Sequence, residues 1–536
     1  MRYIIVIGSI ISGIGKGITS ASIGLLLQSM GHVVTMIKID PYLNVDAGLL
    51  SPYEHGECFV LSDGGECDLD LGNYERSLDI ELTHEHNITT GRIYQSVIEK
   101  ERRGDYLGVT VQIVPHITDE IISHISRVSK IPVNGNSPDI CIIEVGGTVG
   151  DIEALPFIEA LQQMKSQTSD DEFCFVQVTM AISNPELKTK PIQHNIAILR
   201  SRGISPDILV IRAKEEIPKE IKQKLHRLCQ IKESNIISNH DVPTIYHVSE
   251  IFNEQNIVRC ISDKLNLEYI TDPYIMSNKD DIIWHHRRLN ILPKIIIGIV
   301  GKYTNISKSP DTYLSLVRAI EHASFHNDIH VNVEFIDSET VDTGELSHYN
   351  GFIIPGGFGS RGIEGKLLIA KYAREHRVPI LGICLGMQIM AVDCFNNAYL
   401  DRKGYSSEWC DQTFNDNIEY IINILPDQTG IKGGTMRLGN YTTKLIESKV
   451  KGLYCSDTIV ERHRHRYEVN NKYISDIEDT GFHFVGKSKS ENGSDLMEIA
   501  ELENHPFYIG CQYHPEFKSR PMRPHPLFIG LLKACQ

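Results

Sequence analysis

The sequence predicts an α/β protein of two domains, each built on a mostly parallel sheet flanked by helices. Apolar, β-branched runs alternate with helix-like segments along the chain, which is typical of a parallel sheet with crossover helices. A chain of 536 residues is also too long for a single hydrophobic core. We therefore expect one domain at residues 1–270 and another at 294–536, joined by a linker at 271–293.

The predicted strands fall into two series. After an initial run at 3–7, the apolar runs of the first series are residues 33–39, 140–145, 174–181 and 207–212. The second series begins with KIIIGIVGKY at Lys294 and continues with GFIIPGG at Gly351 and VPILGIC at Val378. The stretch between the two series is polar, has no clean period and ends in Pro293, which indicates a linker.

The composition argues against several classes of protein. A net charge of −16 disfavours sequence-independent binding to nucleic acid, which needs a basic face. No run approaches the roughly 20 apolar residues of a membrane helix, and the N-terminus lacks a signal-peptide layout. Twelve cysteines without a C-x-x-C pair indicate reduced thiols. We expect a cytoplasmic protein with neither nucleic acid nor a membrane as a partner.

A glycine-rich loop follows the first predicted strand. In GSIISGIGKGITS, residues 8–20, Lys16 stands among glycines before a helix-like stretch, so backbone N–H groups and the lysine would hold phosphates. This pattern predicts a P-loop-type, Rossmann-like domain. The usual loop reads G-x-x-x-x-G-K-[ST], with the hydroxyl on Mg²⁺. Here Gly17 replaces the hydroxyl and Gly8 lies two residues too far upstream. Such a turn can also serve packing alone, but packing gives no purpose to the lysine.

Two carboxylates are candidates to replace the missing hydroxyl as metal ligands. Asp70 lies in CDLDLG, and Glu144 lies at the C-terminal end of a buried strand in IIEVGGTVGD. Ligands of open α/β sheets collect at that end of the strands, and Mg²⁺ prefers one or two carboxylates with phosphate oxygens and water. The alternative interpretation is a helix-capping Asp70 and a paired Glu144 at the end of a strand.

The second half of the chain contains the residues of an acyl-transfer site. GICLGMQ, residues 382–388, follows an apolar strand and has the form of the G-x-S-x-G nucleophile elbow, with Cys384 in place of the serine. At the start of a helix, this cysteine is expected to have thiolate character. YIGCQYHPEF near the C-terminus supplies His514 as a base and Glu516 as the group that orients it. Backbone N–H groups of Gly357, in PGGFG, and Leu385 would form an oxyanion hole.

An ordered set of motifs resembles the CTP synthases over almost the whole chain. The motifs are GIGKGI (13–18), SPYEHGE (51–57), DLDLGNYER (68–76), TTGRIY (89–94), KERRGDYLG (100–108), IEVGGTVGDIE (143–153) and KTKPIQH (188–194). This resemblance implies a ligase that phosphorylates O4 of UTP with ATP and lets ammonia displace the phosphate. It also implies ATP as co-substrate, Mg²⁺, activation by GTP, feedback inhibition by CTP and a homotetramer, with filaments left open.

The resemblance carries binding roles over to matched positions of the first domain, with Lys16 also catalytic. ATP would be held by Gly13, Ile14, Gly15, Lys16, Gly17, Ile18, Asp70, His240, Asp241 and Val242. UTP and CTP would be held by Ser12, Asp151, Ile152, Glu153, Lys188, Thr189, Lys190, Pro191, Ile192, Gln193 and Lys224. Lys38, in MIKIDPYLN, would help to neutralise phosphate charge. One departure stands out, because TMAISNPEL before the KTKP motif is shorter than the family's usual segment.

The second domain resembles the class I glutamine amidotransferases. By matched position, glutamine would be held by Gly357, Leu385, Gly386, Met387, Gln388, Glu408 and Arg466. Pro52, His55 and Cys58 match an ammonia route between the sites, and Phe358 and Arg361 are plausible contacts of GTP. The basic run at 462–465 would otherwise suggest a nucleic-acid patch, but the acidic whole argues against one.

Two alternatives compete with this interpretation. Amidating ligases such as the cobyrinate amide synthases also join a deviant phosphate loop to a glutaminase-like domain, but SPYEHGE-type and KTKPIQH segments are not expected in them. A non-enzymatic scaffold would have lost Lys16, Asp70, Cys384 or His514, and all four are present.

Overall fold

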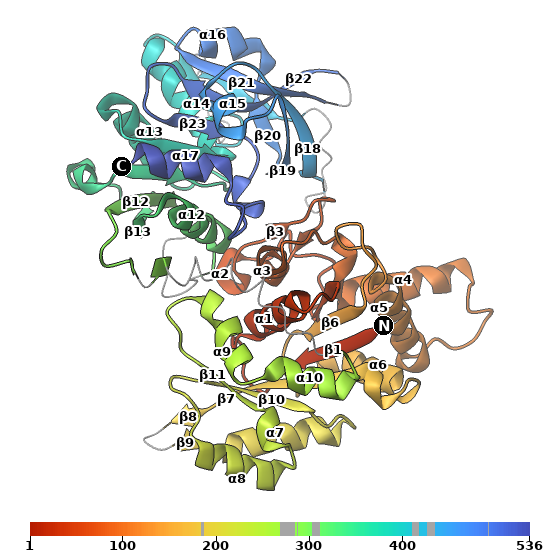
Figure 1. Ribbon diagram of the computed structural model, residues 1–536. Helices are drawn as coiled ribbons and strands as arrows, with labels where there is room; N and C mark the ends of the chain where they lie inside the picture. The colour runs from red at the N-terminus through yellow and green to blue at the C-terminus, as the bar shows by residue number, and fades with distance from the viewer. Residues whose placement is uncertain are drawn as a thin grey trace. The chain divides into compact units, whose positions relative to one another are not determined.

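The computed structural model describes residues 1–183, 187–268, 285–286, 288–302, 311–409, 418–425, 435–490 and 493–536, which form two compact α/β units (Figure 1). Unit 1 comprises Met1–Ala47 and Asp70–His286, and unit 2 comprises Gly48–Leu69 and Arg287–Gln536. Most of the predicted linker, 271–284 and 287, lies outside the described residues. None of the helices in the described parts combines the length and apolar character needed to cross a bilayer.

In unit 1, the described residues build a seven-stranded sheet in the order β11-β10-β7-β1-β6-β2-β5, with every neighbouring pair parallel. Its strands are β1 (Arg2–Ile7), β2 (Val34–Asp40), β5 (Asn87–Thr89), β6 (Ile140–Val145), β7 (Phe173–Met180), β10 (Ile208–Ala213) and β11 (Ile236–His240). The strands expected in the first half of the chain are confirmed within a residue or two. Because the strands are parallel, the loops after them all open at one edge.

Helices cover both faces of this sheet. Successive residues of a strand point to opposite faces, and β1, β2 and β6 are buried along almost their whole length, so both faces need a covering layer. The helices are α1 (Lys16–Ser29), α3 (Leu69–Leu78), α4 (Thr90–Arg103), α5 (Thr118–Val128), α6 (Leu155–Ser166), α7 (Lys190–Ser201), α8 (Lys219–Cys229), α9 (Val248–Glu254) and α10 (Ile257–Leu265). Cys141 and Ile143 of β6 share a buried cluster with α4, α5 and α6. Ile142 between them faces α1, where a Cβ on Gly24 would lie 3.3 Å from its Cδ1.

A side chain covers one edge of this sheet. β11 is the last strand in the order, and Gln255, just after α9, lies against its open side. The Gln255 carboxamide donates to Ser238 O at 2.8 Å and accepts from Ser238 N at 2.8 Å. It therefore forms the pair of hydrogen bonds that a neighbouring strand would form.

The described residues of unit 2 build a nine-stranded sheet in the order β13-β12-β14-β15-β23-β22-β21-β18-β19. The strands are β12 (Lys294–Gly301), β13 (His330–Asp337), β14 (Gly351–Ile354), β15 (Ile380–Ile383), β18 (Arg437–Leu445), β19 (Thr458–His465), β21 (Phe482–Lys489), β22 (Asp495–Leu502) and β23 (Tyr508–Cys511). The half from β13 to β23 is parallel, and the half from β23 to β19 is antiparallel. A smaller sheet contains β16 (Lys403–Ser406), β17 (Ile418–Ile424) and β20 (Tyr467–Val469).

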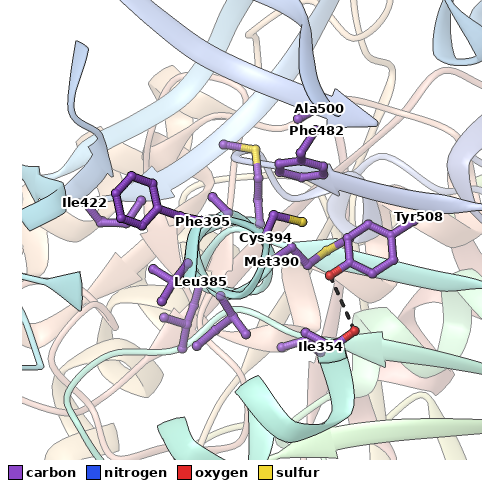
Figure 2. Packing of buried hydrophobic residues seen from close by; sticks show 14 of the residues in the cluster. Ile354, Leu385, Met390, Cys394, Phe395, Ile422, Phe482, Ala500 and Tyr508 are labelled. Carbon is purple, nitrogen blue, oxygen red and sulfur yellow. Dashed lines mark hydrogen bonds between the residues drawn. The ribbon is translucent and has the colours of Figure 1, made fainter. Parts of the chain in front are cut away.

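Two helical layers enclose the sheet of unit 2. The helices are α12 (Leu314–Asn327), α13 (Ile363–His376), α14 (Leu385–Ala398), α15 (Lys449–Tyr454), α16 (Ile474–Glu478) and α17 (Pro526–Ala534). α13 and α14 pack in one cluster, and α12 and α17 pack in the other. Figure 2 shows Met390, Cys394 and Phe395 of α14 among the side chains of Phe482 and Tyr508. α14 is buried from Leu385 to Phe395, so the element that begins beside Cys384 is firmly anchored.

A short segment from the first half of the chain belongs to unit 2. Residues 48–69 contain α2 (Pro52–His55), β3 (Phe59–Val60) and β4 (Glu66–Cys67). Glu57 accepts from Ser315 N at 2.8 Å, and Arg464 Nε donates to Glu66 at 2.9 Å. Contacts between residues more than 250 positions apart thus join this segment to unit 2. The domains predicted from the sequence are continuous stretches, and residues 48–69 lie in the first of them.

Candidate functional site

The glycine-rich loop of unit 1 connects β1 to α1, as predicted. Gly13 and Gly15 have φ values of 68° and 80°, in the left-handed region that favours glycine. Gly15 is the residue before α1, which begins at Lys16. Lys16 Nζ donates to Gly147 O at 3.2 Å, so the lysine lies beside the loop that follows β6. The start of a helix, with its free N–H groups, and this cation form a site suited to phosphate.

Asp70 explains why the loop has a glycine where a hydroxyl residue is usual. A Cβ on Gly17 would lie 2.1 Å from Asp70 Oδ1, well inside contact distance. Any side chain at position 17 would therefore collide with this carboxylate. Asp70 occupies the space that a serine or threonine would need, at the start of α3.

The carboxylates of this site lie among lysines. Asp70 Oδ2 accepts from Lys38 Nζ at 2.6 Å, and Glu144 accepts from Tyr74 OH. Burial opposes ionisation of Asp70, but Lys38 and then Lys16 hold its pKa below the usual value. Burial, followed by the like charge of Asp70, raises the pKa of Glu144 to about 8. A further cation beside these two carboxylates would relieve that repulsion.

Magnesium suits this donor set. Carboxylate oxygens are the protein ligands that Mg²⁺ prefers, and it takes its other ligands from phosphate and water. Clusters of three or more His, Cys, Asp or Glu with metal-binding geometry are absent from the described residues.

The other predicted nucleotide residues follow strands of the same sheet. Ser12–Ile18 follow β1, Asp151–Glu153 follow β6, Lys188–Gln193 follow β7, and His240–Val242 lie at the end of β11. These groups therefore share one edge, and β1 and β11 lie roughly 14 Å apart at three strand spacings. Within them Ile152 is exposed and Ile192 is buried in the core. Lys224 lies exposed on α8, which follows β10.

The nucleophile elbow of unit 2 has the expected strained backbone. Cys384 lies between β15 and α14 with φ 53° and ψ −103°. The glycines on either side permit close packing, because a Cβ on Gly382 would lie 2.3 Å from Met390 Sδ. A Cβ on Gly386 would lie 2.2 Å from Ile354 O. The G-x-C-x-G pattern is therefore required by contacts as well as by the turn.

The predicted base and its orienting carboxylate lie beside this cysteine. His514 Nδ1 donates to Glu516 Oε1 at 2.7 Å, and both residues are buried. A Cβ on Gly356 would lie 2.7 Å from His514 Cε1 and 3.6 Å from Cys384 Cβ, so the two side chains flank one point. Burial opposes the charge on His514, but Glu516 and then Cys384 raise its pKa to about 10. The three side chains therefore lie in the order expected of the predicted nucleophile, base and orienting group.

The PGGFG loop faces the elbow and is held by Lys302, which no sequence motif indicates. A Cβ on Gly357 would lie 3.5 Å from Leu385 Cδ2, so the two predicted oxyanion donors are neighbours. Lys302 Nζ donates to Phe358 O at 2.8 Å and to Gly359 O at 2.6 Å. Burial lowers the pKa of Lys302 to about 8. The lysine fixes the loop that would bind the oxyanion.

The remaining predicted glutamine residues surround the elbow. Glu408 accepts from Gly359 N at 2.8 Å, and burial raises its pKa. Met387 and Gln388 are buried, and Gln388 Nε2 donates to Tyr467 O at 2.9 Å. Arg466 lies just beyond β19 and donates to Thr435 Oγ1 at 3.2 Å. The neighbouring basic run is not a surface patch, because Arg462, His463 and His465 are buried.

A cavity of about 120 Å³ adjoins the triad within unit 2. Its walls come from segment 48–69 and from the loops of the elbow region: Leu50, Pro52, Glu57, Cys58, Thr312, Tyr313, Leu316, Pro355, Gly356, Gly357, Phe358, Arg464, His514, Glu516 and Phe517. Pro52 and Cys58, two of the residues matched to an ammonia route, line it. His55 is exposed at the end of α2 and does not line it.

The predicted GTP contacts, Phe358 and Arg361, lie in and just after the PGGFG loop of unit 2, and Phe358 lines the cavity described above. Phe358 is 39% exposed, and the Arg464 guanidinium lies 5.3 Å from the centre of its ring. Arg361 Nη2 donates to Lys302 O at 2.6 Å and to Tyr53 OH at 3.1 Å. Arg361 therefore connects segment 48–69 to the strand end that carries Lys302.

Comparison with known proteins links both halves of the chain to one family. A family model described as "CTP synthase N-terminus" matches residues 2–267, and one described as "Glutamine amidotransferase class-I" matches residues 309–534. The chain is 47% identical to a CTP synthase of Methanosarcina mazei, over 100% of this chain and 98% of that protein. It is 44% identical to CTP synthase 2 of Xenopus laevis, over 100% and 95%. A solved glutaminase domain of Trypanosoma brucei CTPS with bound acivicin is 29% identical, covers 45% of this chain and 93% of that chain, and has a TM-score of 0.41.

Proposed function

The chain belongs to the CTP synthase family, whose members convert UTP to CTP with ATP and glutamine as substrates, and we propose that its two units divide this reaction. Unit 2 releases ammonia from glutamine, and unit 1 uses ATP to activate UTP and receives the ammonia. The chain is thus a glutamine-hydrolysing carbon–nitrogen ligase rather than an amidating ligase for carboxylates or a scaffold without chemistry.

In unit 2, the Cys384 thiolate attacks the amide carbon of glutamine. The negative charge that forms on the amide oxygen is stabilised by the N–H groups of Gly357 and Leu385. His514, held by Glu516, gives its proton to the leaving nitrogen, so ammonia departs and a thioester remains. His514 then takes a proton from water, whose attack releases glutamate and restores the thiolate. Glu408 and Arg466 hold the ends of the substrate.

In unit 1, the γ-phosphoryl group of ATP passes to O4 of UTP, and ammonia then displaces phosphate at C4. Phosphoryl transfer needs positioning and charge neutralisation more than covalent help from the protein. Lys16 and Lys38 supply positive charge beside the phosphate loop. The groups after β6, β7 and β11 hold the bases and the remaining phosphates at the same edge of the sheet.

Asp70 and Glu144 would hold Mg²⁺ in this site. When bound, the ion neutralises charge on the phosphate oxygens of ATP. The fit rests on the space that Gly17 leaves to Asp70 and on the repulsion between the partly exposed Asp70 and the buried Glu144. Lys38 keeps one oxygen of Asp70 oriented, and Tyr74 does the same for Glu144.

Regulation by nucleotides is part of the same proposal. GTP activates by ordering the edge of unit 2 around Phe358 and Arg361, and CTP inhibits through Asp151–Glu153 and the KTKP segment. The active form is a homotetramer. A cytoplasmic location is supported by the described cysteines, which are all free thiols.

The placement of His514 and Glu516 beside Cys384, which lies on a strained elbow, carries the proposal. The test is the absorbance change on conversion of UTP to CTP by the purified chain with ATP, Mg²⁺ and either glutamine or ammonia. Formation of CTP with both nitrogen donors supports the proposal. Glutamine hydrolysis without amination of UTP would contradict it.

A further inference from the structure

A buried glutamine that the reaction scheme does not use touches the nucleophile. Gln512 follows β23 directly, two residues before His514, and its side chain is inaccessible to solvent. Its backbone N–H donates to Glu498 O at 2.8 Å. Its side-chain Nε2 lies 3.6 Å from Cys384 Sγ, within hydrogen-bond distance for sulfur.

The neighbouring residues determine which end of this amide faces the sulfur. Gln388 Nε2 donates to Tyr467 O at 2.9 Å, and a carbonyl oxygen can only accept, so this atom of Gln388 is its NH₂ group. The same NH₂ lies 3.2 Å from the Gln512 side chain. The facing atom of Gln512 must therefore be its oxygen, and its own NH₂ points at Cys384 Sγ.

We propose that Gln512 is a further catalytic residue, which donates an N–H hydrogen bond to Cys384 Sγ and whose orientation is set by Gln388. The inference deepens the proposed function and rests on Cys384 being the nucleophile. A sulfur that accepts an N–H bond is stabilised as the thiolate relative to the thiol. Arg464 O, 3.7 Å from Sγ, can accept the proton of the thiol and so acts in the opposite sense.

The hydrogen bond acts at two points of glutamine hydrolysis. Before attack it stabilises the thiolate, which then forms the C–S bond while the C–N bond breaks and His514 protonates the nitrogen. During hydrolysis of the thioester the C–S bond breaks, and the sulfur departs as a thiolate that again accepts from Gln512. The N–H proton is not transferred in either step, so the effect is one of charge stabilisation.

Two variants of Gln512 separate the hydrogen bond from packing. Gln512→Met keeps the length and removes the donor, and Gln512→Glu replaces the donor with an acceptor. Both leave in place the charged or titratable groups that interact with Cys384 among the described residues, which are His514, Cys511, Arg464 and Lys366, and also Glu516, the partner of His514. The readout is the rate of Cys384 alkylation by iodoacetamide against pH, followed by mass spectrometry of the Cys384 peptide.

We expect the pH midpoint of alkylation to rise by about one unit in Gln512→Met and further in Gln512→Glu. Glutamine-dependent kcat/KM should fall about 10- to 100-fold, in the same order, while ammonia-dependent CTP formation stays near native. Unchanged midpoints in both variants would overturn the inference. If both variants fail to fold, Gln388→Met is the alternative, because it removes the group that orients Gln512. This variant should raise the pH midpoint of Cys384 alkylation. An unchanged midpoint in Gln388→Met would also overturn the inference.

The proposed function fails separately from this inference. If a Cys384→Ala variant still hydrolysed glutamine, Cys384 would not be the nucleophile, and the premise on which the role of Gln512 rests would fail. Native midpoints in the Gln512 variants, with glutamine hydrolysis abolished in Cys384→Ala, would leave the proposed function intact and reject only the hydrogen bond.

Discussion

Asp70 Oδ1 lies 2.1 Å from the point where a Cβ on Gly17 would sit, so the two positions cannot both carry full side chains in this arrangement. Gly17→Ala should therefore displace Asp70 and lower CTP formation at least about 100-fold with either nitrogen donor, because misplaced catalytic groups lose that much rate. Steady-state kinetics with glutamine and with ammonia measure this. Gly452→Ala, at a glycine with open space around it, is the control and should keep native rates. A Gly17→Ala enzyme with native turnover would show that this contact is unimportant.

Asp70→Asn and Glu144→Gln should each weaken the use of ATP and Mg²⁺ whichever nitrogen donor is supplied. Each removes a carboxylate charge from the predicted metal site, so about tenfold more Mg²⁺ or more should be needed for half-maximal rate. The measurement is a Mg²⁺ titration of ammonia-dependent synthesis. Asp119→Asn, an exposed carboxylate on α5, is the control. Native titration curves in either variant would remove that residue from the ligand set.

Cys384→Ala should abolish glutamine-dependent CTP formation and leave ammonia-dependent formation largely intact. In the proposed scheme Cys384 serves amide hydrolysis alone, and its substitution leaves the sheet of unit 1 untouched. CTP formation is compared with the two nitrogen donors at saturating ATP and UTP. Loss of both activities in a folded variant would refute the division between the units.

The pH dependence of stability should report the charge on His514. Its pKa is raised from an ordinary value of about 6.5 to about 10, with Glu516 the main cause. A raised pKa means that the protonated form stabilises the fold fully below about pH 6.5 and loses this effect as the pH rises through about 10.

The unfolding midpoint of the native chain should therefore exceed that of His514→Gln by a margin that shrinks from about pH 6.5 to about pH 10. Glu516→Gln should move the loss of this margin to lower pH. A margin that is constant over the whole range would contradict the assigned charge.

GTP should stimulate glutamine-dependent synthesis about fivefold or more and leave ammonia-dependent synthesis unchanged. Arg361→Ala should blunt the stimulation, because Arg361 connects Tyr53 to the carbonyl of Lys302 at the edge where GTP is proposed to bind. The control is Arg402→Ala, whose partners Glu419 and Asp476 lie elsewhere in unit 2. Equal stimulation with both nitrogen donors would reject this mechanism.

Local features of the site could be predicted from the sequence. The elbow at Cys384 depends on glycines two residues away, and the loop at Lys16 depends on glycines beside it, so short patterns contain the information. The parallel strands were predictable because each is a continuous apolar run between helical segments. The antiparallel half of the second sheet was not predictable, because its strands include buried polar residues such as Glu461 and Glu498 and are therefore not continuous apolar runs.

Long-range contacts account for what the sequence did not reveal. The place of residues 48–69 in unit 2 depends on pairs such as Glu57 and Ser315, 258 residues apart. Lys302 follows a strand without any motif, and its role depends on the carbonyls of Phe358 and Gly359. Gln512 stands two residues before His514, and that adjacency was the one available sign of its function.

The pairing of Gln255 with Ser238 has a consequence for self-association of the chain. An open strand edge is a template on which another extended segment can add, and this is a common start of domain swapping and aggregation. The carboxamide saturates the N–H and C=O that β11 would offer at its centre, and it also accepts from Lys222 Nζ at 2.9 Å. A single side chain thus occupies the open edge at the centre of β11, so another extended segment could pair with Ser238 only by displacing Gln255.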